Sequence, residues 1–554
     1  MTAANVRKWQ PYMPRKIKDS SSQSYPPGTP RPLILPHTEE AGDPYYIGDI
    51  YQQSQVRLQL SKPALNNGAS LTPYLDHIDR LTDNGWPQLR YLADWMRVTT
   101  APPKLKLLSQ EDKTERASRI KVALLAFDAV SVTRHDVSTA EQLASLCPPS
   151  STGSKELVSC LFVVEDLSRD VIETLGSHLD IDPMFFRGHI SDYTWYNTRD
   201  PWIELPDIDL VSRNRSFCHV RYSSTRYFRD RTSYSLARVE AGGFNVLRRI
   251  DRDGNWVAGA DIPDSAVGTV RSKMSYWVRP RKAKDSDPVI AVLLLDPSLT
   301  EGFPLWGDYN DFSACPSIAD AVPPRPPRGS IFENITYQLQ NMPAQDVEKI
   351  TQDPRALFQR PLYVVCAEWQ TLLRYSNTRL SQLEWEIEDP NLRHLQEDLS
   401  TTLDKIHTWR RRFPIYKTLV SEVLTKVIRR DHFAYASTNS LLLLEQDFEI
   451  VLEELNRLHE RAERIMAVVT AVMSIEESKK ALQQNRSLAR LTYLAVTFVP
   501  LSFVSSFFSM NEDVTKLGRT FWIYAAVAIP VTLLALVVVR FSDTVVNLSR
   551  RFLR

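Results

Sequence analysis

The chain has 554 residues, of which 24% are charged, and its 67 lysine and arginine residues almost balance its 66 aspartate and glutamate residues. This balance argues against a nucleic-acid-binding protein, because such proteins carry a basic excess. The five cysteines lie far apart without CxxC or Cys/His ligand spacing, so the sequence predicts neither a disulfide framework nor a structural zinc site. The length allows a large soluble region of two subdomains in addition to any membrane segment.

Residues 1–50 are predicted to form a disordered N-terminal arm. The stretch 19–36 is rich in Ser, Pro and Gly, which cannot bury enough surface to offset the entropy of ordering. Residues 1–18 are basic and contain no apolar core, which argues against a secretory signal. A mitochondrial presequence is an alternative because such segments are also acid-poor, but Pro11 and Pro14 would interrupt its amphipathic helix.

Residues 51–330 are predicted to form a cytosolic α/β or α+β domain, in which a sheet is flanked by helices. The run 169–179 has the periodicity of a helix, with Ile172, Leu175 and Leu179 on one face. Runs with the alternating or continuous apolar character of strands are 122–130, 156–166, 219–228, 244–250, 267–278 and 289–296. The Pro-rich segment 319–330 is interpreted as a stiff linker, with an SH3-type ligand as the less favoured alternative.

Residues 331–487 are predicted to form a stalk of long helices. Helices are expected over 362–388 and 392–430, with a kink or break in the second at Pro414. A third is expected over 448–508, about 90 Å long at 1.5 Å per residue. Within it apolar residues alternate spacings of four and three, which predicts the seam of a coiled coil or bundle. The members of this seam are Val451, Leu455, Leu458, Ala462, Ile465, Val469 and Val472.

Two transmembrane helices are predicted near the C-terminal end, over 488–508 and 521–540, joined by the loop 509–520 and followed by a basic tail, 541–554. Each apolar run is about long enough to cross a hydrocarbon core of roughly 30 Å.

Arginines lie at both ends of this hairpin, just before the first apolar run and just after the second, whereas the connecting loop contains both acidic and basic residues. By the positive-inside rule both termini are therefore cytosolic. We expect an integral protein of the plasma membrane, with the mitochondrial inner membrane as the alternative.

The three-four spacing continues into the first span and places small and hydroxylated residues on one face. This stripe consists of Asn485, Leu488, Thr492, Ala495, Val499, Ser502, Ser506 and Ser509. Either helices pack closely along the stripe, because small residues let backbones approach, or the stripe lines a narrow, wettable pore.

The residues that follow the stripe favour the pore. Asn511 offers an amide oxygen that can bind the water shell of Mg²⁺, an ion that gives up its waters reluctantly. The carboxylates of Glu512 and Asp513 would concentrate cations at the outer mouth. Between Leu491 and Phe508 the first span carries no charge, and so no buried acid, which argues against a proton-coupled carrier.

The segment FVPLSFVSSFFSMN (498–511) resembles the signature of CorA-type divalent-cation channels, in which a Phe-hydrophobic-Pro-Leu-Ser/Thr-Phe run leads to Gly-Met-Asn between two C-terminal spans. The segment 163–190 resembles the cytosolic domain of fungal CorA-like proteins, and the likeness covers roughly residues 120–550. This resemblance implies a homopentamer whose first spans line the pore, with acids of the internal domain sensing the cation.

The resemblance also assigns individual residues. Met510 and Asn511 occupy the Met and Asn positions of an ion-recognition loop that we extend over Ser509, Met510, Asn511, Glu512 and Asp513. Asn485 and Val499 fall at inner pore-facing places, and Ser502 matches a hydroxyl place. The chain departs from the pattern at Ser509, where the family has Gly. Serine is strained there if the position needs a positive φ and is tolerated if only small volume is required.

The leading hypothesis is a passive Mg²⁺ channel in which Asn511 holds the hydrated cation and no organic cofactor takes part. The alternatives are a zinc-transporting branch of the same superfamily and a pentameric, non-conducting membrane scaffold. An enzyme is disfavoured because no HExxH, P-loop or GxSxG motif is present, and His189 and His459 are expected to be structural. The sequence does not rank Mg²⁺ against Co²⁺, Ni²⁺ or Zn²⁺, because such oxygen sites discriminate by geometry.

Overall fold

A computed structural model of the protein describes most of the chain after residue 71. The described ranges are 72–99, 109–128, 131–147, 157–191, 208–248, 250–252, 265–280, 288–305, 317–319, 329–388, 399–430, 439–509, 522–534 and 537. The chain divides into two compact units: residues 1–394 with 407–462, and residues 395–406 with 463–554. The predicted arm 1–50, most of the Pro-rich linker and the tail 541–554 lie outside the described residues.

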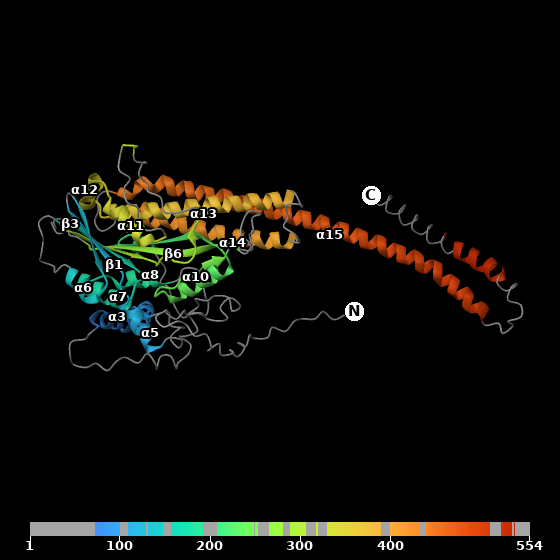
Figure 1. Cartoon of the computed structure of the whole chain (residues 1–554), viewed down its shortest axis with the longest axis horizontal. Helices are drawn as coiled ribbons and strands as arrows, with labels where there is room; N and C mark the ends of the chain where they lie inside the picture. Colours follow the sequence, from blue (N-terminus) through green and yellow to red (C-terminus); the bar gives the residue numbers. More distant parts are fainter. Residues whose placement is uncertain are drawn as a thin grey trace. The chain divides into compact units, whose positions relative to one another are not determined.

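The first unit contains an eight-stranded sheet with strand order β2-β1-β3-β7-β6-β4-β8, and β5 pairs with β6 (Figure 1). Among the described strands only β3 and β7 pair in parallel, and the other pairs are antiparallel. The strands are β1 Val122–Asp128, β2 Val132–Val137, β3 Leu157–Glu165, β4 Phe217–Phe228, β5 Ile250–Arg252, β6 Ala266–Val278, β7 Val289–Leu295 and β8 Phe303–Pro304. The parallel strand β7 is buried along its whole length, as its continuous apolar sequence requires.

Helices cover both faces of this sheet (Figure 1). The helices before β7 are α3 Pro73–Asp83, η1 Pro87–Leu89, α4 Arg90–Val98, α5 Gln110–Ser118, α6 Ala140–Leu146, α7 Arg169–Leu179, α8 Pro183–Ile190, α9 Asp209–Ser212 and α10 Arg231–Gly243. Alternate strand residues such as Phe162 and Val292 join α3, α4, α7 and α8 in one core. On the opposite face Tyr276 of β6 stacks on Phe358 of helix α13 (Ala356–Glu388), with ring centroids 4.8 Å apart.

The α+β prediction for the soluble region is confirmed, with one strand in error. The runs predicted at 122–130, 156–166, 219–228, 267–278 and 289–296 are strands, and the helix at 169–179 is α7. The run 244–250 is wrong, because among its described residues, 244–248 and 250, only Ile250 belongs to a strand. The backbone N–H groups of Asn245 and Val246 donate to the carboxylate of Asp166, at 2.9 and 3.2 Å, so they are not free for a sheet ladder.

Long helices follow the sheet, as predicted, with bounds that differ from the expected ones. The helices after the sheet are α11 Ile331–Gln340, α12 Ala344–Gln352, α13 Ala356–Glu388, α14 Leu399–Val423, the π-helical turn η4 Leu424–Ile428, the 3₁₀ turn η5 Ser440–Leu444 and α15 Glu445–Ser509. A break at Pro414 is wrong, because α14 continues through that residue. The expected separation at 389–390 lies outside the described residues.

The predicted seam of α15 is buried within a single chain. Val451, Leu455, Leu458 and Ala462 are at most 4% exposed, Ile465 and Val469 are also buried, and Val472 is half-buried. Arg461 shows which helix lies beside this part of α15, since it donates to Glu384, Asn377 and Ser381 of α13. The seam therefore packs inside the subunit, and its apolar spacing is not by itself a sign of association between subunits.

Candidate functional site

The predicted stripe lies along the exposed side of α15. The helix is continuous from Glu445 to Ser509, and every stripe residue from Asn485 to Ser509 is exposed in the single chain. Among the larger members, Leu488 is 59% and Val499 is 65% exposed. The spacing thus places these residues together on one face, as predicted, and that face is open.

The second apolar helix, Trp522–Leu534, covers the opposite face. The Tyr524 hydroxyl donates to the carbonyl of Leu501 at 3.4 Å. Val504 is only 6% exposed, and Ala528 on the second helix is 1% exposed. Val504 follows Ala495 by nine positions, so the two side chains lie on opposite sides of α15 at about 100° per residue. The stripe is therefore left uncovered by the segment that packs on the same helix.

Only one described helix is long and apolar enough to cross a membrane, Ser440–Ser506, and it includes residues 488–506 of the predicted first span. The described part of the predicted second span, Trp522–Leu534, is apolar but shorter than the roughly 20 residues that a crossing requires. The prediction of two spans is thus supported in its first half only.

The ion-recognition loop is described only at its first residue. Ser509 is exposed and is the last residue of α15, so its backbone is helical and serine there carries no positive-φ strain. Met510, Asn511, Glu512 and Asp513 lie outside the described residues. Within the described part of the chain there is no group of three or more His, Cys, Asp or Glu side chains that could hold a metal ion.

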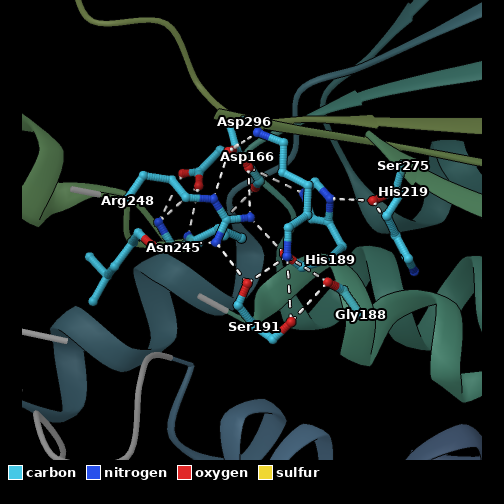
Figure 2. Close-up of polar contacts among 12 residues, drawn as sticks. Asp166, Gly188, His189, Ser191, His219, Asn245, Arg248, Ser275 and Asp296 are labelled. Atoms are coloured by element: carbon cyan, nitrogen blue, oxygen red, sulfur yellow. Dashed lines mark hydrogen bonds and ion pairs between the residues drawn. The ribbon is translucent and has the colours of Figure 1, made fainter. Parts of the chain in front are cut away.

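The segment 163–190, which resembles part of the cytosolic domain of fungal CorA-like proteins, contributes to a buried polar cluster in the first unit (Figure 2). Its members are Asp166, Gly188, His189, Ser191, His219, Asn245, Arg248, Lys273, Ser275 and Asp296. Two cations in this cluster meet the C-terminal end of α8. Lys273 Nζ donates to the carbonyls of Gly188 and Ser191 at 2.7 and 2.6 Å, and Arg248 donates to that of His189 at 2.6 Å. They satisfy carbonyls that a helix leaves unpaired at its end.

Asp296 balances this positive charge at the end of β7. Its carboxylate accepts from Arg248 Nε and from the backbone N–H of Lys273, both at 2.7 Å. Burial raises the pKa of Asp296, while the guanidinium of Arg248 opposes that shift. The cluster thus joins α8 to β6 and β7 through a paired and hydrogen-bonded carboxylate.

Ser275, His189 and Asp296 superficially resemble a hydrolase triad. Ser275 Oγ lies 2.9 Å from His189 Nδ1 and 2.7 Å from His219 Nδ1, and His189 Nε2 lies 3.5 Å from Asp296. Burial lowers the pKa of both histidines, which are therefore neutral, and Ser275 donates to one ring and accepts from the other. Ser275 and His189 are 0% exposed, so no substrate reaches them and the set is structural.

The close packing of α8 on β4 explains why a glycine stands at position 188, which helical periodicity does not predict. A Cβ atom on Gly188 would lie 2.3 Å from His219 Nε2, so only glycine fits between α8 and β4 at that point. Asp166 has φ 55°. Its carboxylate accepts hydrogen bonds from the backbone N–H groups of Asn245 and Val246 and from the guanidinium of Arg119, the last at 3.3 Å. The motif residues of this region thus serve the fold, as expected for His189.

Glu368 is a buried acid at the packing of α13 on β4. It is 8% exposed, and burial raises its pKa from 4.5 to about 8, although the charge of Arg226 opposes the shift. Arg226 directs its own donors to the carbonyls of Glu301 and Gly302 at 3.2 and 3.1 Å. Glu368 is therefore protonated in the folded protein at neutral pH.

We expect Glu368→Gln to stabilise the protein at pH 7. Because the folded pKa exceeds the unfolded one, the native state loses stability as pH rises from about 4.5 to 8, by about 3 kcal/mol at pH 7. Unfolding in detergent, followed from pH 5 to pH 8.5, should show the parent losing stability with pH and the variant losing much less. Glu348→Gln, at an exposed glutamate of α12, is the matched control and should keep the slope of the parent. Equal slopes for Glu368→Gln and the parent would contradict a protonated Glu368.

Comparison with known proteins addresses the part of the chain that carries the stripe. Residues 328–541 match the family model of the CorA-like Mg2+ transporter protein. This range runs from the start of α11 past the second apolar helix and includes the FVPLSFVSSFFSMN segment, but it is less than half of the chain. No curated protein matches the sequence.

Solved structures give a weaker likeness over a longer range. The CorA magnesium transporter from Methanocaldococcus jannaschii is 11% identical, with a TM-score of 0.35, over 76% of this chain and 97% of its own. The full-length CmaX protein is 12% identical, with a TM-score of 0.36, over 76% of this chain and 98% of its own. At these values we draw no argument from the two structures.

Proposed function

We propose that the protein is a CorA-like divalent-cation channel that conducts Mg²⁺ through an oligomeric pore lined by the stripe of α15. The observation that carries this proposal is the open stripe itself. It stands on the face opposite the second helix, inside the range that matches the CorA-like family model. The match supports the transporter class, and the geometry supports the identity of the pore-lining face.

A stripe facing lipid would be unfavourable, whereas a stripe facing a shared axis is useful. It presents the hydroxyl groups of Ser502, Ser506 and Ser509, and small or hydroxylated residues on a spanning helix serve better against another helix or a water-filled pore than against hydrocarbon. Closed symmetry around an axis brings the same face of each copy together. We propose five copies, as the resemblance implies, with both termini cytosolic and 521–540 as the outer span.

The ligand chemistry of the loop supports Mg²⁺ in this proposal, and the flux comparison below ranks Mg²⁺ against Zn²⁺. A ring of Asn511 amide oxygens suits a cation that keeps several waters, as Mg²⁺ does. Zn²⁺ favours His and Cys ligands, which the loop 509–520 lacks. Uptake needs no pump, because a membrane potential of 100 mV is worth about 2.3 kcal/mol per charge and therefore about twice that for a divalent ion.

The test is ion flux into proteoliposomes of the purified protein, with Mg²⁺, Zn²⁺ and no divalent cation compared. The proposal predicts Mg²⁺ influx that exceeds Zn²⁺ influx and increases with inside-negative potential. Predominant Zn²⁺ influx would favour the zinc-transporting alternative, and absence of flux for both ions would favour a non-conducting membrane scaffold.

A further inference from the structure

An exposed apolar row lies along α15 just before the predicted first span. Its members are Val468, Ile475 and Leu482, which are 51%, 54% and 60% exposed in the single chain. They recur every seven residues of a continuous helix, so they share one side of it, while the buried seam lies on another side. The described part of the chain leaves about half of each side chain uncovered, and such aligned apolar groups indicate an interaction surface.

Small residues form a second row with the same spacing on a different flank of α15. Each of them precedes a member of the apolar row by one position, so the two rows are about 100° apart around the helix. This small row consists of Ala467, Ser474 and Ala481, all of which are exposed. Seven residues after Ala481 the spacing reaches Leu488, so the small row continues into the stripe. One flank of the helix thus carries large apolar groups and another has space for them.

The two rows complement each other when copies of α15 stand parallel and in register around an axis. In a closed ring of four to six copies, the directions from one copy to its two neighbours differ by about 90° to 120°, and the rows of α15 are about 100° apart. The apolar row of one copy therefore meets the small row of the next. Because the two rows are offset by one residue, facing side chains differ in height by only about 1.5 Å.

Charges beside the two rows complement each other in the same arrangement. Lys479 lies next to the apolar row, four residues after Ile475, and Glu477 lies next to the small row, three residues after Ser474. Both charges are exposed, and parallel copies bring Lys479 of one toward Glu477 of the next. These charges also exclude hydrocarbon as the cover of the apolar row, because charged side chains are costly in a bilayer core.

We propose that residues 464–486 of α15 bind the same segment of a neighbouring copy, with Ile475 of one copy packed on Ser474 of the next and Lys479 paired with Glu477. This inference rests on the proposed function, since it takes the oligomer of that proposal and assigns a contact to it outside the span. Burial of the apolar row provides the attraction. The charge pair selects parallel, in-register copies, as flanking charges do in coiled coils.

The first test is the stability of the full-chain oligomer in detergent, measured by light scattering after size-exclusion chromatography at decreasing protein concentration. In Ile475→Asn the concentration at which half of the oligomer dissociates should rise about tenfold or more, because an apolar contact is lost. Ile475→Val keeps an apolar side chain and should change it by less. Ile415→Asn, at an isoleucine of α14 that is 39% exposed, is the matched control and should equal the parent. An unchanged oligomer in Ile475→Asn would overturn the inference.

The second test exchanges the charges. Glu477→Lys and Lys479→Glu should each raise the dissociation concentration about threefold or more, and the double variant should return it to the value of the parent. Residues two apart do not face each other on a helix, so such a recovery has to come from a contact between copies. Both side chains are exposed, so neither change disturbs the folded chain. Losses that simply add in the double variant would overturn the assigned pair.

Mg²⁺ flux into proteoliposomes distinguishes failure of this inference from failure of the proposed function. An oligomer that responds to the variants as expected but shows no flux would support the interface and reject the channel. Flux through a parent whose oligomer is insensitive to Ile475→Asn and to both charge changes would overturn the interface alone. A parent that is monomeric at every concentration would overturn the interface as well.

Discussion

Asn511→Ala is expected to abolish Mg²⁺ flux into proteoliposomes while leaving the amount of folded oligomer unchanged. In the proposed channel each copy contributes one Asn511 amide oxygen to a ring that accepts from the water shell of the ion. Alanine offers no oxygen, and a hydrated Mg²⁺ then has nothing to replace its contacts with bulk water. Flux of Mg²⁺ under an imposed potential is the measurement, with size-exclusion chromatography to check assembly.

The double variant Glu512→Gln, Asp513→Asn is the control for Asn511→Ala. It keeps the amide ring and removes only the field at the mouth, so uptake should weaken mainly at low ionic strength. At physiological ionic strength the field of surface charges is screened within about 8 Å. Undiminished flux in Asn511→Ala would remove Asn511 from the site.

In the proposed channel, cation bound between the internal domains holds the subunits together and keeps the pore closed. Val499→Ser is expected to give a leaky channel that conducts even when internal Mg²⁺ is high. Val499 is 65% exposed on the stripe, and with Leu488 it forms the apolar inner half, whereas Ser502, Ser506 and Ser509 form the outer half. A symmetric ring of apolar side chains excludes water from a narrow pore, and a hydroxyl at that ring lets water remain. The measurement is Mg²⁺ flux at low and high internal Mg²⁺.

Leu494→Ser is the control for the gate, since it also puts a serine in place of an exposed apolar residue of the first span, but about 140° from Val499 around the helix and outside the stripe. It should remain as tightly regulated as the parent. If Val499→Ser is also regulated like the parent, the apolar ring at Val499 is not the gate.

The elements that sequence reasoning placed correctly are those whose local pattern and tertiary role agree. The runs that became β1, β3, β6 and β7 are apolar because they cross a covered sheet, and α7 shows its buried face through Ile172, Leu175 and Leu179. The stripe was predictable for the same reason, since helical spacing alone decides which residues share a face of α15.

The failures have a different origin. The run 244–250 has strand-like residues, but two of its backbone N–H groups, those of Asn245 and Val246, donate to the carboxylate of Asp166, which is distant in sequence. The contacts of Arg248 and Lys273 with the end of α8 are likewise invisible to periodicity, because charged residues usually indicate an exposed face. The sequence also did not predict that the α15 seam is buried within one chain. A three-four repeat indicates a partner helix but does not tell whether that helix belongs to the same subunit.

The measurement that tests the central claim most directly is cysteine modification along α15. Ser506 belongs to the stripe, and Ser505 is its neighbour about 100° around the helix. Both are exposed serines, so Ser506→Cys and Ser505→Cys are equally conservative and differ only in face. A charged thiol reagent should block Mg²⁺ flux in Ser506→Cys and leave flux unchanged in Ser505→Cys and in the parent with its five native cysteines. Block of Ser505→Cys with an unaffected Ser506→Cys would show that the stripe does not face the ion path.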